Sequence, residues 1–140
     1  MKFITYPYST PFDPDETEPK NLVGDVEKEL SDLSKQRNDL YLRVKSFLGK
    51  LKKVKDITNY LKNQQIEKFS GDKEGLYEMR IPKQARGGVV RIYFCFSVTE
   101  ENTIILLDLE LKHKKKPMRL DVAHTKMLRY KELVQQGKML

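Results

Sequence analysis

The sequence predicts one α+β domain with a small antiparallel β-sheet and a helical hairpin packed on one face of that sheet. Residues 76–112 hold three apolar, β-branched runs separated by turn-forming residues, which is the pattern of a three-stranded meander. Residues 22–56 place apolar side chains three or four positions apart, as amphipathic helices do. With 140 residues, 39% of them hydrophobic and 34% charged, the chain is long enough for one core and has the ordinary composition of a soluble domain.

Two segments of the predicted meander are able to reverse the chain. The first, residues 82–88, contains a proline and a Gly-Gly pair, and the second, residues 99–102, is polar and ends in Asn102. Proline, glycine and asparagine each favour the backbone conformations that turns require. We therefore expect the three runs to pair as antiparallel neighbours.

The register of the first hairpin follows from keeping its apolar side chains on one face. Pairing Ile81 with Val90 does this, and it sets Arg80 directly opposite Arg91. The same face continues into the third strand if Phe96 pairs with Ile105. The other expected neighbours are Tyr77 with Phe94, Met79 with Ile92, Leu107 with Phe94, and Leu109 with Ile92. One face of the meander is thus predicted to be core, and the other to be charged, with Asp108, Glu110 and Lys112 beside the arginines.

The opposed arginines Arg80 and Arg91 require an anion nearby, because like charges directly across an antiparallel pair destabilise it. One solution is an internal salt-bridge network with Glu78 or Glu110. The other is a bound phosphate, because the planar guanidinium group matches phosphate oxygens. Both solutions remain open, and they are compatible, since a carboxylate can hold an arginine in place for a ligand.

The remaining segments complete the order β-α-α-β-β-β-α. Pro7 favours a sheet edge for the first strand, and Pro117 suits the first turn of the last helix. The hairpin is expected as two helices or one long bent helix. The expected segments are an N-terminal strand and acidic loop (1–21, with the strand at 2–8), the helical hairpin (22–56), a short helix and loop (56–75), the meander (76–112) and a C-terminal helix (117–136).

The charge and the residue counts narrow the function classes. The net charge of +7 favours polyanions or anionic surfaces as partners, and residues 110–140 carry nine lysines and arginines against three acids. No apolar run is long enough to span a membrane and no signal-peptide pattern is present, so we expect a cytoplasmic protein without a membrane partner. One cysteine, Cys95, and two histidines supply no zinc-type ligand set, and the phosphate-binding glycine loops of nucleotide enzymes are absent. We expect no metal and no cofactor.

Six features follow one another along the second half of the chain: LYEMR, a basic glycine-containing turn, VVRIYFCF, a further apolar strand, a lysine-rich segment ending in Pro117, and a helix with a late Arg-Tyr. In this order they resemble the RelE/ParE superfamily. The similarity is to its HigB-like, phage-derived branch, and it covers residues 76–130. It implies a RelE-like α+β fold. It also implies the toxin of a type II toxin–antitoxin module, a metal-independent endoribonuclease (mRNA interferase) that cuts mRNA, often on the ribosome, and that binds a cognate antitoxin protein.

The resemblance also implies roles for individual residues. Arg80 and Arg91 match basic sheet positions of the family and would bind the phosphate and stabilise the transition state. Lys112 matches a family lysine, although many relatives have two adjacent lysines where this chain has Leu111 and Lys112. His113 is the candidate for proton transfer after 2′-hydroxyl attack, because the pKa of histidine lies nearest neutrality; the alternative is an exposed histidine in a basic linker.

Further residues are candidates for RNA contact. Lys114, Lys115 and Lys116 are either a clamp on the RNA backbone or a solvated loop, and Tyr130 is a packed core residue, a base-stacking platform or an acid/base group. Two other function classes remain open on the same fold: a non-catalytic RNA- or ribosome-binding protein, and a protein-interaction module.

Overall fold

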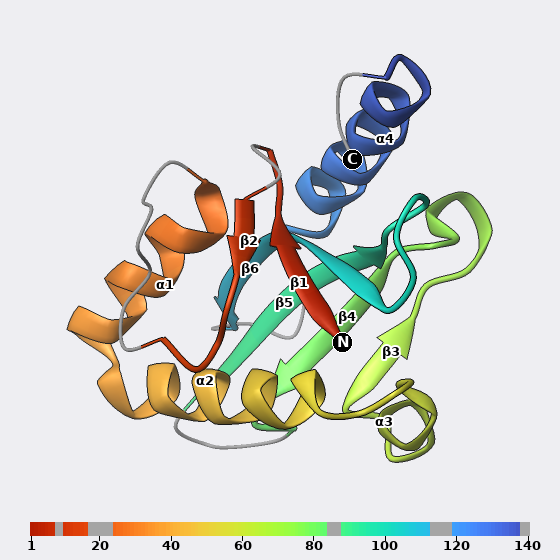
Figure 1. Ribbon diagram of the computed structural model, residues 1–140. Helices are drawn as coiled ribbons and strands as arrows, with labels where there is room; N and C mark the ends of the chain where they lie inside the picture. The colour runs from red at the N-terminus through yellow and green to blue at the C-terminus, as the bar shows by residue number, and fades with distance from the viewer. Residues whose placement is uncertain (8–9, 17–23, 84–87, 113–118, 138–140) are drawn as a thin grey trace.

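Figure 1 shows the computed structural model, which describes residues 1–7, 10–16, 24–83, 88–112 and 119–137. The described residues form an α+β fold, as predicted, with six strands in one sheet and four α-helices. The strands are β1 (Lys2–Thr5), β2 (Thr10–Phe12), β3 (Ile66–Lys68), β4 (Tyr77–Ile81), β5 (Val89–Phe96) and β6 (Thr103–Lys112). The helices are α1 (Asp25–Gln36), α2 (Asn38–Lys52), α3 (Thr58–Lys62) and α4 (Leu120–Gln135), with one 3₁₀ turn at Gly71–Lys73.

The sheet has the order β2-β1-β6-β5-β4-β3 and is mixed, because β1 runs parallel to β6 while the other neighbours are antiparallel. The expectation of a purely antiparallel sheet was therefore wrong. The expected edge position of the first strand was also wrong, since β1 lies between β2 and β6. The edge is formed by β2, which falls in the segment predicted to be a loop. Its Pro11 suits an edge strand, where a missing backbone N–H leaves no ladder bond unmade.

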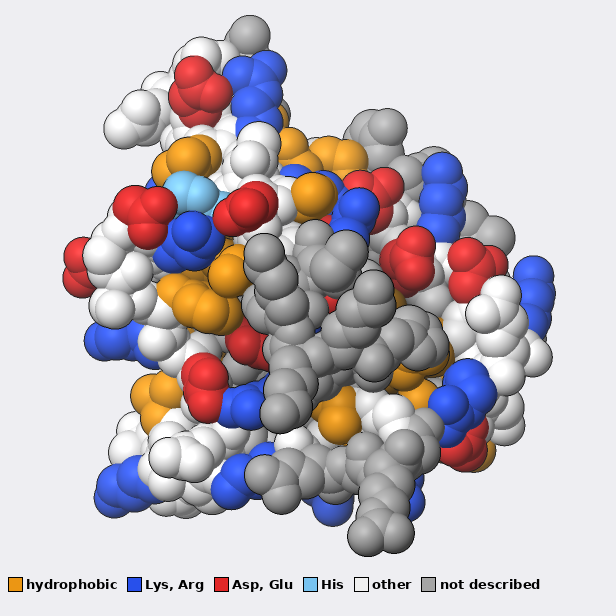
Figure 2. All heavy atoms as spheres, turned by 180° about the vertical axis from the view of Figure 1, so that it is seen from behind, with side chains coloured by type: hydrophobic (Ala, Val, Ile, Leu, Met, Phe, Trp, Pro, Cys, Tyr) orange, Lys and Arg blue, Asp and Glu red, His pale blue; other side chains and the backbone are white. Residues whose placement is uncertain are grey.

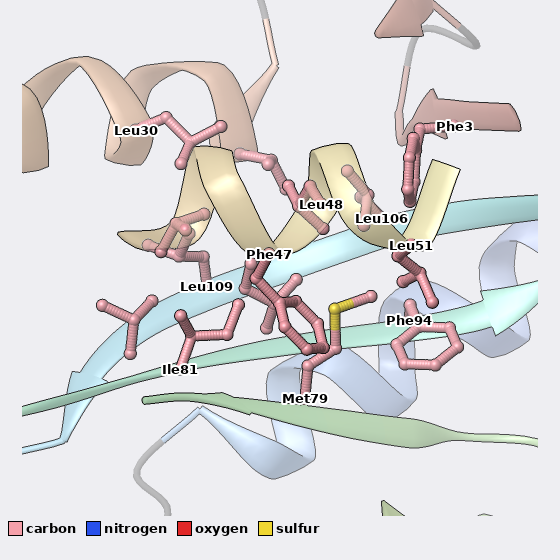
Figure 3. Close-up of a cluster of buried hydrophobic side chains, with 14 of the residues drawn as sticks. Phe3, Leu30, Phe47, Leu48, Leu51, Met79, Ile81, Phe94, Leu106 and Leu109 are labelled. Atoms are coloured by element: carbon pink, nitrogen blue, oxygen red, sulfur yellow. The ribbon is translucent and has the colours of Figure 1, made fainter. Parts of the chain in front are cut away.

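Helices α1 and α2 form the predicted helical hairpin and cover one face of the sheet (Figures 1 and 3). The two helices are separated at Arg37, whose φ of −141° lies outside the helical range. Figure 3 shows Phe47, Leu48 and Leu51 of α2 beside the strands. Each fully buried side chain of this size contributes about 1.5–3 kcal/mol through removal from water. The hydrophobic core between the helical hairpin and the sheet includes these residues of the strands: Phe3, Met79, Ile81, Val90, Ile92, Phe94, Ile104, Leu106 and Leu109.

The opposite face of the sheet is divided between an apolar half and a charged half. Helix α4 packs over the apolar half, where Tyr93 and Leu107 are fully buried together with Met127 and Tyr130 of the helix. The expectation that this whole face would be charged was therefore wrong. Strand β5 is buried on both faces over most of its length, and a sheet layered between helices requires this.

The register of the first hairpin is confirmed at all of its expected pairs, including Arg80 opposite Arg91. The β5–β6 register is confirmed at Ile92 and Leu109 but is one residue different beyond them, where Phe94 lies opposite Leu106 rather than Leu107. The same shift sets Phe96 opposite Ile104 rather than Ile105. The cause is a β-bulge, an extra residue in β6 that the sequence analysis did not anticipate.

The bulge brings two consecutive side chains of β6 to the same face of the sheet. Leu107 packs in the core under α4, and the next residue, Asp108, binds Arg119 and Lys126 on the same side. A regular strand would have sent one of the two to the opposite face. The bulge thus lets β6 supply both an apolar contact and a carboxylate to α4.

Candidate functional site

Four strands contribute charged side chains to the half of the sheet that α4 leaves uncovered. We call this set the charged face, and define it by Glu67, Glu78, Arg80, Arg91 and Glu110. The registers place Glu67 opposite Glu78, Arg80 opposite Arg91, and Arg91 opposite Glu110, so the side chains follow one another across β3, β4, β5 and β6. Adjacent strands bring such residues within reach of one another.

Arg91 is held in a buried ion pair. Its Nε lies 3.1 Å from Oε1 of Glu78, and the two side chains are only 6% and 8% exposed. Burial raises the pKa of Glu78, and the charge of Arg91 opposes that rise. The internal salt bridge to Glu78 is thus confirmed for Arg91, which is not open to a ligand from solvent in this structure.

Arg80 binds a carboxylate that the sequence analysis did not consider. Its guanidinium pairs with Glu67 of β3 and donates a 3.3 Å hydrogen bond to the carbonyl of Gln64. The Arg80 side chain is 22% exposed and that of Glu67 is 46% exposed. Of the two arginines, Arg80 is therefore the one that a solvent-borne phosphate can approach.

Glu110 links the charged face to the start of α4. Its Oε2 accepts a 2.9 Å hydrogen bond from the Tyr93 hydroxyl and a 2.7 Å hydrogen bond from the backbone N–H of Arg119. Burial, together with this carboxylate, raises the pKa of Tyr93. Because Arg119 directly precedes the first residue of α4, the contact also fixes the beginning of that helix.

The five residues that define the charged face carry a slight excess of negative charge. Its five defining residues are two arginines and three glutamates, and both arginines have a carboxylate partner. On the back of the molecule, seen in Figure 2, basic and acidic side chains are likewise intermingled. Of these two arginines, only Arg80 offers a phosphate an accessible guanidinium group, and the five residues of the charged face carry no surplus of positive charge.

The predicted basic segment after β6 falls largely outside the described residues. Lys112 is the last residue of β6, where its backbone pairs with Val89, and its side chain is not described. His113 and Lys114, Lys115 and Lys116 also lie outside the described residues. Their proposed proximity to Arg80 and Arg91 stays a prediction.

Tyr130 lies in the core between α4 and the sheet. It is 1% exposed, and its hydroxyl accepts a 3.4 Å hydrogen bond from the Val98 N–H and lies 3.4 Å from Oγ of Ser97. The ring thus has no exposed face on which a base could stack, and of the interpretations open for Tyr130 the structure favours packing over RNA binding.

Cys95 is also a core residue. It is 1% exposed, and burial raises the pKa of its thiol to about 12, so the neutral form is the one present near neutral pH. Across the described ranges, no group of three or more histidine, cysteine, aspartate or glutamate side chains is placed to hold a metal ion. In the same ranges, none of the helices is both long and apolar enough to cross a membrane.

Sequence reasoning missed the partner of Arg80 because it placed Glu67 in a loop. The sequence feature that indicates a strand here is one apolar residue, Ile66, followed by one polar residue, Glu67. In the structure Ile66 is 1% exposed. A strand of three residues gives too few alternations to be distinguished from a loop.

Comparison of the sequence and the fold with known proteins gives no match, either among family models, among curated proteins or among solved structures.

Proposed function

We propose that this chain is a RelE/HigB-like toxin, a metal-independent endoribonuclease that cleaves mRNA in the cytoplasm and is held inactive by an antitoxin protein. The observation that carries the proposal is the pair of arginines, Arg80 and Arg91, side by side on β4 and β5 in the expected register. The helical hairpin on one face of the sheet and the closing helix α4 support the proposal, whereas β2, β3 and the parallel pairing of β1 with β6 depart from the expected element order.

The proposed reaction needs three groups. A base takes the proton of the ribose 2′-hydroxyl, whose oxygen attacks the adjacent phosphorus. A cation stabilises the added negative charge, and an acid protonates the 5′ oxygen as its bond to phosphorus breaks. The products are a 2′,3′-cyclic phosphate and a 5′-hydroxyl end. His113 would carry the proton transfers, and Arg80 would neutralise the phosphate.

The geometry divides the work between the two arginines. Arg80 is partly exposed and can touch the phosphate, whereas Arg91 is buried against Glu78. We therefore assign Arg91 a positioning role, in which its ion pair fixes the strand beside Arg80. The neighbouring phosphates of the RNA would be bound by Lys112, Lys114, Lys115 and Lys116. These four lysines belong to the C-terminal region in which the positive charge of the chain is concentrated.

A second function is favoured by the neutralised charge of the site. Because each arginine already has a carboxylate partner, the same fold could bind RNA, the ribosome or a partner protein without cleaving RNA. Binding of this kind would depend on salt but would leave transcripts intact.

The test is induced expression of the wild type, Arg80→Ala and His113→Ala, with growth and mapped mRNA 5′ ends as readouts. Arg129→Ala is the matched control, since Arg129 is an exposed arginine on α4 that pairs with Glu132. We expect growth arrest and new 5′ ends with the wild type and the control, and loss of both with the other two variants. Soluble, folded wild-type protein that leaves growth and transcripts unchanged would contradict the nuclease.

A further inference from the structure

We propose that Glu67 is an exchangeable counterion of Arg80, which an RNA phosphate displaces when RNA binds. This inference rests on the proposed RNA-directed function and concerns the same site. It makes Glu67 a positioning residue, one that orders the Arg80 guanidinium in the free protein and sets the affinity with which phosphate is taken up.

Glu67 is the carboxylate partner of the Arg80 guanidinium, whereas the contacts with Gln65 hold the Arg80 backbone. The Arg80 backbone N–H donates a 2.9 Å hydrogen bond to the Gln65 carbonyl, and the Gln65 side chain lies 3.4 Å from the Arg80 carbonyl. The guanidinium also reaches the Gln64 carbonyl at 3.3 Å. If Glu67 rotates away toward solvent, the contacts with Gln65 still hold the backbone of β4 beside β3, and the Gln64 carbonyl still accepts a hydrogen bond from the guanidinium.

The two ion pairs of the charged face differ in how easily they open. The Arg91–Glu78 pair is buried, and opening it would separate two charges that water cannot readily reach. The Arg80–Glu67 pair has a carboxylate that is 46% exposed, so that both groups can be rehydrated when they separate. Exchange with a ligand is therefore open to Arg80 and closed to Arg91.

In the free protein Glu67 also faces a like charge. Glu67 lies directly opposite Glu78 in the β3–β4 register, and like charges in that position destabilise a strand pair. The charge of Glu67 is one of the causes that raise the pKa of Glu78. A phosphate that binds the Arg80 guanidinium can accept two parallel hydrogen bonds from it. Further contacts between the RNA and the protein would add to the free energy that favours the exchange.

The experiment measures the affinity for a 2′-O-methyl RNA oligonucleotide, which cannot be cleaved by 2′-hydroxyl attack, by fluorescence anisotropy at several salt concentrations. The proteins are the wild type, Glu67→Gln, Arg80→Gln and the double variant. Glu132→Gln is the matched control, because Glu132 is an exposed glutamate that also pairs with an arginine. Thermal unfolding of each variant checks that it remains folded.

We expect Glu67→Gln to bind the oligonucleotide about 1.4-fold to fivefold more tightly, the range expected when a competing exposed ion pair is removed. Glu132→Gln should bind as the wild type does. In the Arg80→Gln background, Glu67→Gln should give no gain, because the guanidinium that the carboxylate competes for is gone.

Four outcomes would overturn the inference. An equal gain from Glu67→Gln and Glu132→Gln would reduce the effect to general electrostatics, and a gain that persists in the Arg80→Gln background would separate Glu67 from Arg80. RNA binding by the wild type that Glu67→Gln leaves unchanged would reject the exchange but keep the proposed function. If no protein in the set binds RNA, the proposed function itself fails, and this inference fails with it.

Discussion

The Asp108 carboxylate, which is 1% exposed, accepts a 2.8 Å hydrogen bond from Nε of Arg119. Its other oxygen lies 3.5 Å from Nζ of Lys126, which also pairs with Asp25 at the start of α1. One buried carboxylate of β6 thus binds the beginning of α4, and the lysine next to it connects α4 to α1. The helices on the two faces of the sheet are joined through this cluster.

Replacing Lys126 with methionine should lower the free energy of unfolding by about 1–3 kcal/mol, because the buried Asp108 then loses one of its two cationic partners. Lys53→Met, at an exposed lysine that directly follows α2, should change it by less than about 0.5 kcal/mol. Urea unfolding of both variants measures the difference. Equal effects of the two substitutions would show that the cluster does not stabilise the fold.

The ion pair of Lys126 with Asp25 should make part of the free energy of unfolding depend on pH. Its hydrogen bond lowers the pKa of Asp25. A carboxyl group whose pKa is lowered by folding contributes stability that is present above its unfolded pKa of about 4 and is lost as the pH falls through the lower folded value. The stability difference between the wild type and Lys126→Met should therefore shrink as the pH falls below about 4. Urea unfolding across this pH range measures it, and a constant difference would contradict the assignment.

The buried pair of Glu78 and Arg91 should be costly to break and cheap to replace. Glu78→Leu leaves the Arg91 charge buried without this partner, and we expect a loss of about 3–5 kcal/mol. Adding Arg91→Met removes the stranded charge and should restore most of that loss. A double variant as unstable as Glu78→Leu alone would mean that the pair shapes the fold beyond its own two charges.

The bulge in β6 gives a direct test of which side Leu107 faces. Leu107→Ala opens a cavity in the core under α4 and should cost about 2–5 kcal/mol. The loss should be coupled to Met127→Ala on α4 by about 0.5–3 kcal/mol, and it should be additive with Leu48→Ala on α2. Double-mutant cycles measure the coupling. Coupling of Leu107→Ala to Leu48→Ala, together with additivity with Met127→Ala, would place Leu107 on the α2 side and contradict the bulge.

The first hairpin was predictable because its pattern is locally unambiguous. Met79 and Ile81 alternate with Glu78 and Arg80, so a shift by one residue would turn the charged side chains toward the face that packs on α2 and the apolar ones away from it. The run Ile104 to Leu107 has no such alternation, because both of its faces are buried. A one-residue bulge in that run leaves no trace in the sequence.

The sandwiching of the sheet between helices had a signal that was not used. The second half of β5 is apolar at every position, which is typical of a strand covered on both faces. For the site, Glu78 could be foreseen as a partner of Arg91 because the two lie on adjacent strands of one hairpin. Glu67 could not, since its contact with Arg80 depends on the three-residue strand β3.

The parallel pairing of β1 with β6 has a consequence for the order of folding. Lys2 pairs with Thr103 and Thr5 with Leu106, so these contacts join residues separated by most of the chain. Long-range contacts of this kind close late, because the entropy of the intervening chain opposes them. During synthesis the β1–β2 hairpin must wait for β6 to emerge, while Phe3 has no sheet to pack on. We therefore expect the meander and the helical hairpin to assemble first, and the N-terminal hairpin to dock last.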